Sequence, residues 1–371
     1  MHIINSDQTF DVLILGGGPA GTSTALHLAR SGVSVALVER NYYQKESMGE
    51  TIHPSVKQQL QNMGIWARFC EDQHFPSYGN RSAWGDDLLK ENQFFFNPYG
   101  TGWHLDRNRF NKMLINSAEQ AGVRVITDER VCLLSKCLAG GWTMKLEGRK
   151  ETLSARLLID ATGRSGNGSS FSEAQRVIID RLIGIRGVMS LKSGVRRDLY
   201  ALTEAVEDGW WYSAYVPSGN LVVYFFTDVD LAKTRDYLSI DGWVLSLRKT
   251  IYTQLRSSFC LNEEKLVVRT ASSSCLNKVV GENWLAVGDA ACAFDPLSSF
   301  GIQKGLYMGE KAALTVINYL KFGNLSILQK YEDEVKKSFN SYLMQRVKFY
   351  SIEQRWPNSK FWQRRRCSVS I

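Results

Sequence analysis

The stretch TFDVLILGGGPAGTSTALHLARSGVSVALVER, residues 9–40, decides the fold. Its apolar run over residues 12–15 is typical of a parallel strand that is buried on both faces. A G-x-G-x-x-G pattern of Gly16, Gly18 and Gly21 follows at once. We expect a helix over about residues 20–31, whose unpaired N–H groups would favour an anion at the loop. This order of strand, glycines and helix predicts a nucleotide-binding βαβ unit.

The second strand of this unit, expected over residues 33–38, leads into Glu39. A carboxylate at this point can accept hydrogen bonds from both ribose hydroxyls of an adenosine. Pro19 and Ala20 complete the glycine loop, and we expect Arg40 to contact the same nucleotide. The unit therefore predicts a dinucleotide, either FAD or NAD.

Three further segments extend the pattern. In LAVGDAACAFDPLSSFGIQKG, residues 285–305, an apolar strand stops at Gly288-Asp289, and a helix is expected from about Gly301. Taken alone, such an aspartate can also be a carboxylate that caps a turn. The other two segments are HLDRNRFNKMLINSAEQAGVRVI, residues 104–126, where Asp106 can cap a helix, and LLIDATGRSG, residues 157–166.

In this order the motifs resemble those of FAD-dependent aromatic monooxygenases and the related flavin-dependent halogenases, over about residues 10–320. The resemblance implies that FAD is the cofactor and that Asp289 binds its ribityl chain. A helix starting near Gly301 would stabilise the negative charge of reduced flavin. The other FAD contacts that we expect are Arg107 or Arg109, Val131, Asp160, Gly163, Gly288, Pro296, Ser298, Ser299 and Ile302.

The segment SMGETIHPSVKQQL, residues 47–60, resembles the G-E-x-x-x-P loop of the halogenase-like branch. The resemblance implies that Gly49 and Glu50 border the flavin. Glu50, His53 and Tyr212 are candidates for catalytic proton transfer. His53 can equally be a hydrogen-bonded loop residue.

The predicted fold class is α/β, or α+β overall. A discontinuous Rossmann-type FAD-binding domain covers residues 1–80, 104–170 and 268–325. Alternating residues rich in aromatic side chains predict an antiparallel substrate-covering sheet over 81–103 and 171–267, with a turn at 217–220. Trp210, Trp211 and Tyr215 either form the core of that sheet or line its cavity. Residues 326–371 are expected to form helices and a basic tail.

The composition indicates the number of domains and the cellular compartment, and it argues against metal and membrane binding. The chain has 371 residues, of which 44% are hydrophobic, enough for about two domains. The seven cysteines contain no C-x-x-C pair, which is typical of a reducing cytoplasm and predicts no metal site. No signal peptide and no apolar run of about 20 residues is present, so no membrane partner is expected.

The net charge of +8 is concentrated at the C-terminal end. Residues 345–371 hold seven Lys or Arg and one acid, Glu353. Such a tail is either solvated or docks on an acidic protein partner, and the near-neutral remainder argues against nucleic acid.

Two observations reduce the number of reactions that a flavoenzyme of this type could catalyse. Tyr212, Ala214, Val216 and Pro217 stand at the positions of the W-x-W-x-I-P signature of tryptophan halogenases, so both of its tryptophans are absent, which disfavours halogenation. The chain more narrowly resembles the maturation flavoproteins of cysteine tryptophylquinone-dependent glycine and lysine oxidases. This resemblance implies a monooxygenase that uses O2, through a flavin C4a-hydroperoxide, to oxygenate a specific Trp in an oxidase precursor. The precursor would dock partly on the basic tail.

Several alternatives remain open at this point. The substrate can instead be a small or carrier-tethered aromatic molecule. The chain can also be a flavin-binding chaperone or electron-transfer protein without oxygenation, or a reductase of isoprenoid double bonds. Because there is only one glycine motif of this kind, the electron donor is left as NAD(P)H or reduced flavin.

Overall fold

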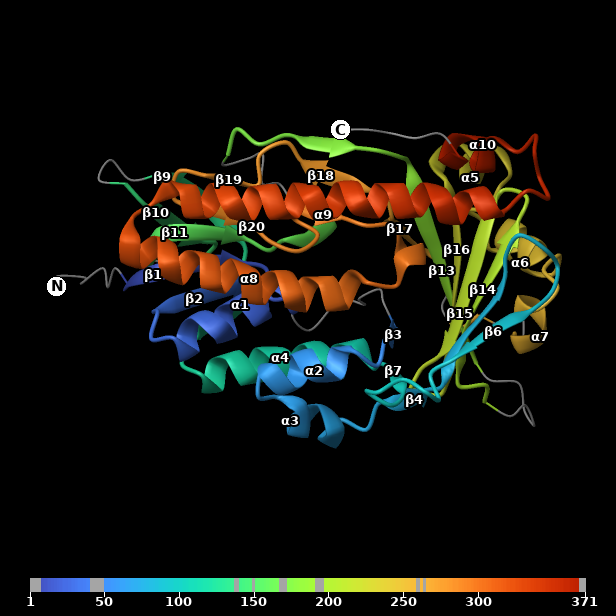
Figure 1. Cartoon of the computed structure of the whole chain (residues 1–371), viewed down its shortest axis with the longest axis horizontal. Coiled ribbons are helices and arrows are strands. Elements are labelled where there is room, and N and C mark those ends of the chain that lie inside the picture. The colour runs from blue at the N-terminus through green and yellow to red at the C-terminus, as the bar shows by residue number, and fades with distance from the viewer. Residues whose placement is uncertain are drawn as a thin grey trace.

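The computed structural model describes residues 8–40, 50–136, 140–148, 151–166, 172–190, 197–257, 261–262 and 265–366. Its two large sheets lie toward opposite ends of an elongated molecule (Figure 1). Gly49, one of the predicted cofactor contacts, lies outside the described residues.

The first sheet is the nucleotide-binding one. Five neighbouring strands are parallel to one another, in the order β20, β11, β1, β2 and β8. The strands of this sheet are β1 (Gln8–Leu15), β2 (Val35–Glu39), β8 (Arg124–Thr127), β9 (Val131–Lys136), β10 (Trp142–Leu146), β11 (Thr152–Asp160), β19 (Val280–Gly281) and β20 (Trp284–Ala286).

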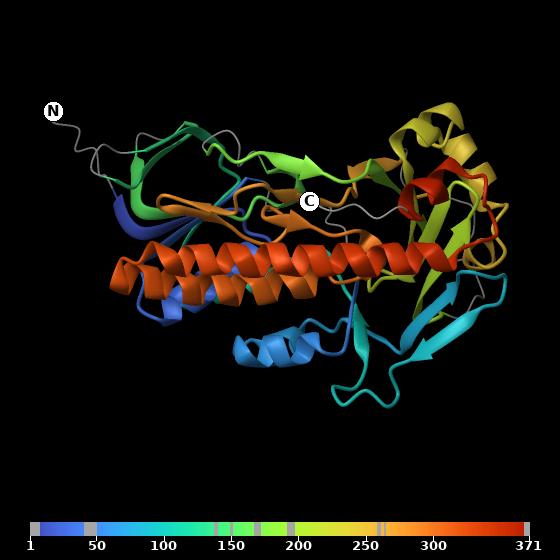
Figure 2. The same cartoon turned by 45° about the horizontal axis from the view of Figure 1, so that its top comes forward.

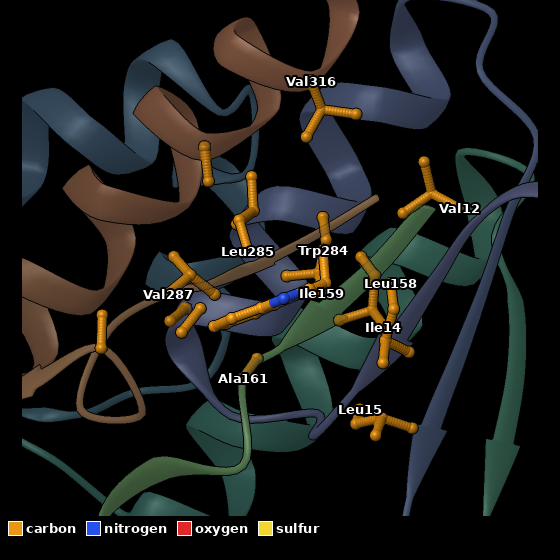
Figure 3. Close-up of a cluster of buried hydrophobic side chains, with 14 of the residues drawn as sticks. Val12, Ile14, Leu15, Leu158, Ile159, Ala161, Trp284, Leu285, Val287 and Val316 are labelled. Atoms are coloured by element: carbon orange, nitrogen blue, oxygen red, sulfur yellow. The ribbon is translucent and has the colours of Figure 1, made fainter. Parts of the chain in front are cut away.

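Continuous apolar runs explain why these strands are parallel and central. Val12 and Ile14 of β1 and Ile159 of β11 are fully buried, and they pack in one cluster with Leu285 and Val316 (Figure 3). Strands of this kind need cover on both faces, and α1 (Pro19–Arg30) and α8 (Gly301–Phe322) contribute Ala25, Leu28, Ala312 and Val316 to this cluster. The hydrophobic pattern of residues 12–15 is thus satisfied by burial on both sides.

Three helices lie close to the glycine loop: α1 (Pro19–Arg30), α4 (Arg107–Gln120) and α8 (Gly301–Phe322). α1 begins at Pro19, a residue suited to the first helical position, so its start lies one residue before the predicted one. α1 and α8 approach closely at Gly309. A Cβ at this position would lie only 2.6 Å from Cβ of Ser23, so glycine is needed there. The Ser23 hydroxyl donates to the Leu306 carbonyl at 2.8 Å, which fixes the two helices together.

The second sheet has seven strands and is antiparallel except where β14 pairs with β5. The predicted turn joins β15 to β16, with Val216 N–H donating to the Asn220 carbonyl at 3.0 Å. The strands are β5 (Gly79–Ala83), β6 (Lys90–Gln93), β13 (Leu182–Ser190), β14 (Tyr200–Val206), β15 (Gly209–Tyr215), β16 (Asn220–Asp228) and β17 (Val267–Thr270).

Helices α5 (Val229–Thr234), α6 (Ile240–Leu247) and α7 (Thr253–Arg256) contribute to the outer side of this sheet. On that side Trp211 stacks on Phe225 and meets Trp243 of α6, with ring centroids 4.6 and 5.1 Å away. The opposite side of the sheet carries Trp210, Tyr224 and Phe226, which lie in a separate cluster. The alternation seen in the sequence therefore separates an outer core from an inner wall.

Small sheets and short helices complete this part of the chain. Two three-stranded sheets are formed by β3 (Thr51–Ile52), β7 (Gly102–His104) and β4 (Phe75–Ser77), and by β12 (Arg176–Ile178), β18 (Ser274–Leu276) and β21 (Cys292–Ala293). The short helices are α2 (Val56–Asn62) and α3 (Trp66–Glu71). The sheets differ from the predicted domain boundaries at two places, because β12 pairs with β18, and β17, at 267–270, joins the second sheet.

The C-terminal segment consists of α9 (Leu325–Ile352) and α10 (Lys360–Arg366). α9 runs along the molecule between its two ends (Figure 2). Several basic side chains of this segment form ion pairs within the chain. Arg365 Nη2 lies 2.5 Å from Asp228 Oδ1, and Arg364 Nη2 lies 2.7 Å from Asp230 Oδ2. Arg346 and Arg355 are also in ion pairs. The described part of the tail is therefore packed on the molecule.

Among the described residues, no helix is both long and apolar enough to cross a membrane.

Candidate functional site

The predicted motifs meet at one edge of the first sheet. The register pairs Leu15 with Asp160, and Asp160 with Ala286, so strands β1, β11 and β20 end side by side. The loops that follow these ends carry the glycine pattern, the ATGR segment and the GDAA segment. In open parallel sheets, ligands bind at this carboxyl edge.

The glycine loop needs glycine for steric reasons. Gly16 has φ +105°, and a Cβ there would lie 2.3 Å from the Ala161 carbonyl oxygen. A Cβ on Gly21 would lie 1.9 Å from the Gly16 oxygen. Glu39 holds the same loop, because its Oε2 accepts a hydrogen bond from Gly17 N–H at 2.7 Å.

A cavity of about 290 Å³ lies between this edge and the second sheet. Most of the predicted cofactor contacts line it. They are Gly18, Pro19, Ala20, Glu50, Arg107, Gly163, Asp289, Pro296, Ser298, Ser299, Gly301 and Ile302, together with the catalytic candidate Tyr212.

The opposite wall comes from the second sheet. Side chains at alternate positions face the cavity: Thr203, Trp210, Tyr212, Tyr224, Phe226 and Thr270. Trp210 stacks on Phe226 with centroids 4.1 Å apart. Trp211 and Tyr215 lie in the separate outer core cluster. Of the three residues left open by the sequence, only Trp210 lines the cavity.

Asp289 lies between two cations. Its Oδ1 is 2.7 Å from Lys304 Nζ, and its Oδ2 is 3.1 Å from Arg164 Nε. Burial by itself would raise the pKa of Asp289, but the charges of Lys304 and Arg164 lower it below its ordinary value. The carboxylate is therefore ionised and fixed at the cavity wall.

Asp295 supports the segment that follows Asp289. It is 1% exposed, and its Oδ1 accepts from Leu297 N–H at 2.9 Å, which caps the 3₁₀ turn Pro296–Ser298. Two α9 side chains hold its other oxygen: Tyr350 donates at 2.8 Å and Arg346 Nε at 3.3 Å. Helix α9 thus positions the turn that precedes Gly301.

Glu50 and Arg107 both line the cavity, and Glu50 is buried. Tyr224 O–H donates to Glu50 Oε1 at 2.9 Å. Burial lowers the pKa of Arg107, and the charge of Glu50 opposes this shift. Asp106 caps α4 by accepting from Arg109 N–H at 3.0 Å, as expected. The Arg109 guanidinium donates to the Asp72 carbonyl at 2.6 Å, so of the two candidate arginines Arg107 is the one that lines the cavity.

Tyr212 belongs to a hydrogen-bonded chain. Its oxygen is 2.7 Å from Thr51 Oγ1, which is 2.9 Å from His104 Nδ1. His104 Nε2 lies 3.2 Å from the Leu199 carbonyl oxygen. Burial lowers the pKa of His104 to about 4, and burial raises that of Tyr212 far above its ordinary value. Both groups are therefore neutral near pH 7.

The other predicted site residues do not line the cavity: they are Gly16, Gly21, Glu39, Arg40, His53, Val131, Asp160 and Gly288. Asp128 N–H donates to the Glu39 carbonyl at 2.8 Å, so the chain leading to Val131 passes beside Glu39. Asp160 accepts from Thr162 N–H at 2.9 Å and caps that turn. His53 Nδ1 lies 2.8 Å from Ser55 Oγ, which agrees with the loop role and leaves proton transfer by His53 a prediction.

The residues present fit FAD. Gly18, Gly163 and Gly301 line the cavity, and a Cβ on any of them would meet no other atom within 4 Å, so backbone lies open to a ligand there. α8 begins at Gly301 and presents unpaired N–H groups. The glycine loop and Glu39 would hold the nucleotide end, and residues 296–302 with Asp289 would hold the flavin end. The donor set therefore suits a long, anionic dinucleotide.

Sequence reasoning missed several contributors, among them Lys304, Arg164, Thr51, His104 and Asp295. Lys304, Arg164, Thr51 and Asp295 lie within the motif segments, and their proximity in sequence to predicted site residues was the available signal. His104 is the first residue of the segment 104–126, but its contact with Thr51 depends on the pairing of β3 with β7, which no local pattern indicates.

Comparison with known proteins finds relatives that are named as flavin-dependent enzymes. The chain is 28% identical over 365 residues to the putative FAD-dependent oxidoreductase LodB of Marinomonas mediterranea, covering 96% of this chain and 97% of LodB. It is 25% identical to the flavin-dependent halogenase armH4 of Armillaria mellea, over 82% of this chain and 64% of that one.

Solved structures share the fold. The myxobacterial chondrochloren halogenase CndH superposes with a TM-score of 0.87 at 21% identity, over 97% of this chain and 86% of CndH. The peptidyl tryptophan dihydroxylase QhpG, essential for tryptophylquinone cofactor biogenesis, superposes with a TM-score of 0.80 at 23% identity, over 96% of this chain and 78% of QhpG.

The resemblance inferred from the motifs is confirmed, and with it the mixed α/β fold. Residues 9–345 match the model of the FAD binding domain family, and the chain belongs to this family of FAD-dependent oxidoreductases.

Proposed function

We propose that this enzyme is a monooxygenase that oxygenates a specific tryptophan in the precursor of a cysteine tryptophylquinone-dependent amino-acid oxidase. The observation that carries the proposal is the aromatic wall of Trp210, Tyr212, Tyr224 and Phe226 opposite the cofactor loops. Such a wall suits a planar, electron-rich ring. The near end-to-end match to LodB, a putative FAD-dependent oxidoreductase, supports the enzyme class, and the fold shared with a peptidyl tryptophan dihydroxylase agrees with this choice of substrate.

When bound and reduced, FAD would supply the activation of O2. One oxygen atom would enter the indole ring and the other would leave as water, with two electrons from NAD(P)H or free reduced flavin. The α8 N-terminus at Gly301 would stabilise negative charge at the flavin end of the cavity. The fixed carboxylate of Asp289 would orient the ribityl chain through its hydroxyls. The apolar wall would exclude water from the reacting ring.

Docking of the precursor on the basic C-terminal tail stays a prediction. Arg346, Arg355, Arg364 and Arg365 already form ion pairs within the chain, so fewer charges are available than the sequence suggested. The described cysteines, Cys70, Cys132, Cys275 and Cys292, are free thiols, in keeping with the cytoplasm as the proposed compartment.

A second candidate is halogenation or hydroxylation of a small or carrier-tethered aromatic molecule. The relatives and structural neighbours that are named halogenases favour it. The same cavity would then hold a free or carrier-tethered ring, and in halogenation an oxidised halide would replace oxygen as the group transferred.

Co-expression with a candidate oxidase precursor tests the proposal. Mass spectrometry of the precursor should show added oxygen on one tryptophan, and none when that tryptophan is replaced by phenylalanine. Asp289→Ala, which should lose FAD, is the control on the enzyme side. An unmodified precursor, together with turnover or halogenation of free aromatic compounds, would favour the second candidate and contradict the first.

A further inference from the structure

Three aromatic side chains of the cavity wall form hydrogen bonds with partners in the protein, and two of them are the donors. Trp210 Nε1–H donates to the Tyr350 hydroxyl at 3.1 Å, and Tyr224 O–H donates to Glu50 Oε1 at 2.9 Å. The third, Tyr212, is 2.7 Å from Thr51 Oγ1, a contact in which either hydroxyl could be the donor. The direction of this last bond decides what Tyr212 offers to a ligand.

The neighbours of Thr51 settle that direction. The Leu199 carbonyl can only accept, so the hydrogen of a neutral His104 ring must be on Nε2, at 3.2 Å from that oxygen. His104 is fully buried, and its lowered pKa of about 4 keeps the ring neutral near pH 7. Nδ1 then has no hydrogen and accepts from Thr51 O–H at 2.9 Å. Since the only hydroxyl hydrogen of Thr51 is used, Thr51 must accept from Tyr212.

We propose that Tyr212 recognises the substrate ring by accepting a hydrogen bond from it, and that Thr51 and His104 are positioning residues that keep the Tyr212 oxygen an acceptor. The inference rests on the proposed function: the donor is the indole N–H of the target tryptophan. The aromatic wall then offers rings for stacking and oxygens that accept. A ring of the same shape without a donor leaves a polar oxygen unpaired in the cavity, which a site of this kind rejects.

Binding of three matched probes to the FAD-loaded protein tests this inference. They are N-acetyl-L-tryptophanamide, its 1-methylindole derivative, and the analogue in which benzothiophene replaces indole. Titration calorimetry should show about tenfold weaker binding for the two probes that lack N–H, the value of one hydrogen bond. Tyr212→Phe should bind the indole and benzothiophene probes with similar affinity.

The variant Thr51→Val distinguishes the hydrogen-bonding role of Tyr212 from a purely steric role of its ring. This variant keeps the Tyr212 ring but frees its hydroxyl to rotate and donate into the cavity, so the preference for N–H should disappear. A purely steric role of Tyr212 would leave the preference unchanged. Thr203→Val, which removes another hydroxyl of the cavity wall, is the matched control and should keep the preference. Flavin absorbance and thermal unfolding of each variant confirm that it is folded and loaded.

The outcomes distinguish this inference from the proposed reaction. An unmodified precursor combined with the expected order of probe affinities would leave the acceptor role standing and contradict the reaction. Equal wild-type affinity for the three probes, no binding of the indole probe, or a preference that survives both Tyr212→Phe and Thr51→Val would overturn the acceptor role.

Discussion

Lys304 Nζ lies 2.7 Å from Asp289 Oδ1, and so joins the first part of α8 to the loop after β20. The lysine also lies over the Phe294 ring, 4.3 Å from its centroid. With Arg164 on the other carboxylate oxygen, one acid is shared by two cations. This arrangement fixes the aspartate that we propose as the ligand of the FAD ribityl chain.

Lys304→Met should destabilise the protein and weaken FAD binding. The lysine side chain is 8% exposed, and breaking a buried ion pair costs about 3–5 kcal/mol. Because Arg164 remains and Asp289 is partly exposed, we expect a smaller loss, about 1–3 kcal/mol in the free energy of unfolding. Urea unfolding measures it, with Lys321→Met, an exposed change in the same helix, as control. Equal free energies of unfolding for the two variants would show that the Lys304–Asp289 ion pair does not stabilise the fold.

The stability should depend on pH through His104. Its pKa is about 4 in the folded protein and 6.5 as its ordinary value, so the unfolded chain binds more protons between these values. Stability should therefore rise with pH across this window, with a contribution from His104 of about 1.4 kcal/mol per pH unit. His104→Asn should show a shallower slope in urea unfolding at several pH values from 4.5 to 6.5. Parallel slopes would mean that His104 does not titrate as described.

Asp106→Ala should destabilise α4, the helix that carries Arg107 into the cavity. The variant removes the bond from Arg109 N–H to Asp106 Oδ1, and the loss of such a cap costs about 0.5–2 kcal/mol. Chemical denaturation measures the effect. Asp106→Ser, which can also cap, should recover most of the stability, and failure to do so would point to the charge of Asp106 instead.

Trp210 and Trp211 should respond differently to replacement by phenylalanine, because they lie on opposite faces of β15. Trp210→Phe should weaken binding of an aromatic ligand to the FAD-loaded protein, since Trp210 lines the cavity. Trp211→Phe should lower the melting temperature and leave the ligand affinity unchanged, since Trp211 is in the outer core. Titration and thermal unfolding of both variants check this, and equal losses of affinity would contradict the assignment of faces.

Local patterns were enough to predict the glycine loop and the strand that ends at Glu39. Gly16 and Gly21 are required by contacts with residues near in sequence or at the adjacent strand end, and Glu39 ends the next strand. The turn at residues 296–298 and the helix start at Gly301 were likewise predicted from one continuous motif, and their contact with the cofactor stays a prediction. In these cases a short stretch of sequence determines both the element and its position.

Contacts between distant segments could not be predicted in the same way. Thr51 and His104 are opposite each other only through the pairing of β3 with β7. Asp295 is held by Tyr350 of α9, and Trp210 by the same tyrosine, so the two walls of the cavity share a support that no motif reveals. Strand alternation placed Trp210 and Tyr212 on one face, but only packing decided which face is the cavity.

The most direct test of the proposed reaction uses the purified FAD-loaded enzyme, a purified oxidase precursor, a reductant and O2 labelled with oxygen-18. The target tryptophan should gain labelled oxygen, as measured by mass spectrometry of the precursor peptides, and Asp289→Ala should add none. A precursor that gains no oxygen while the enzyme consumes reductant and O2, or that gains oxygen only from water, would contradict the account.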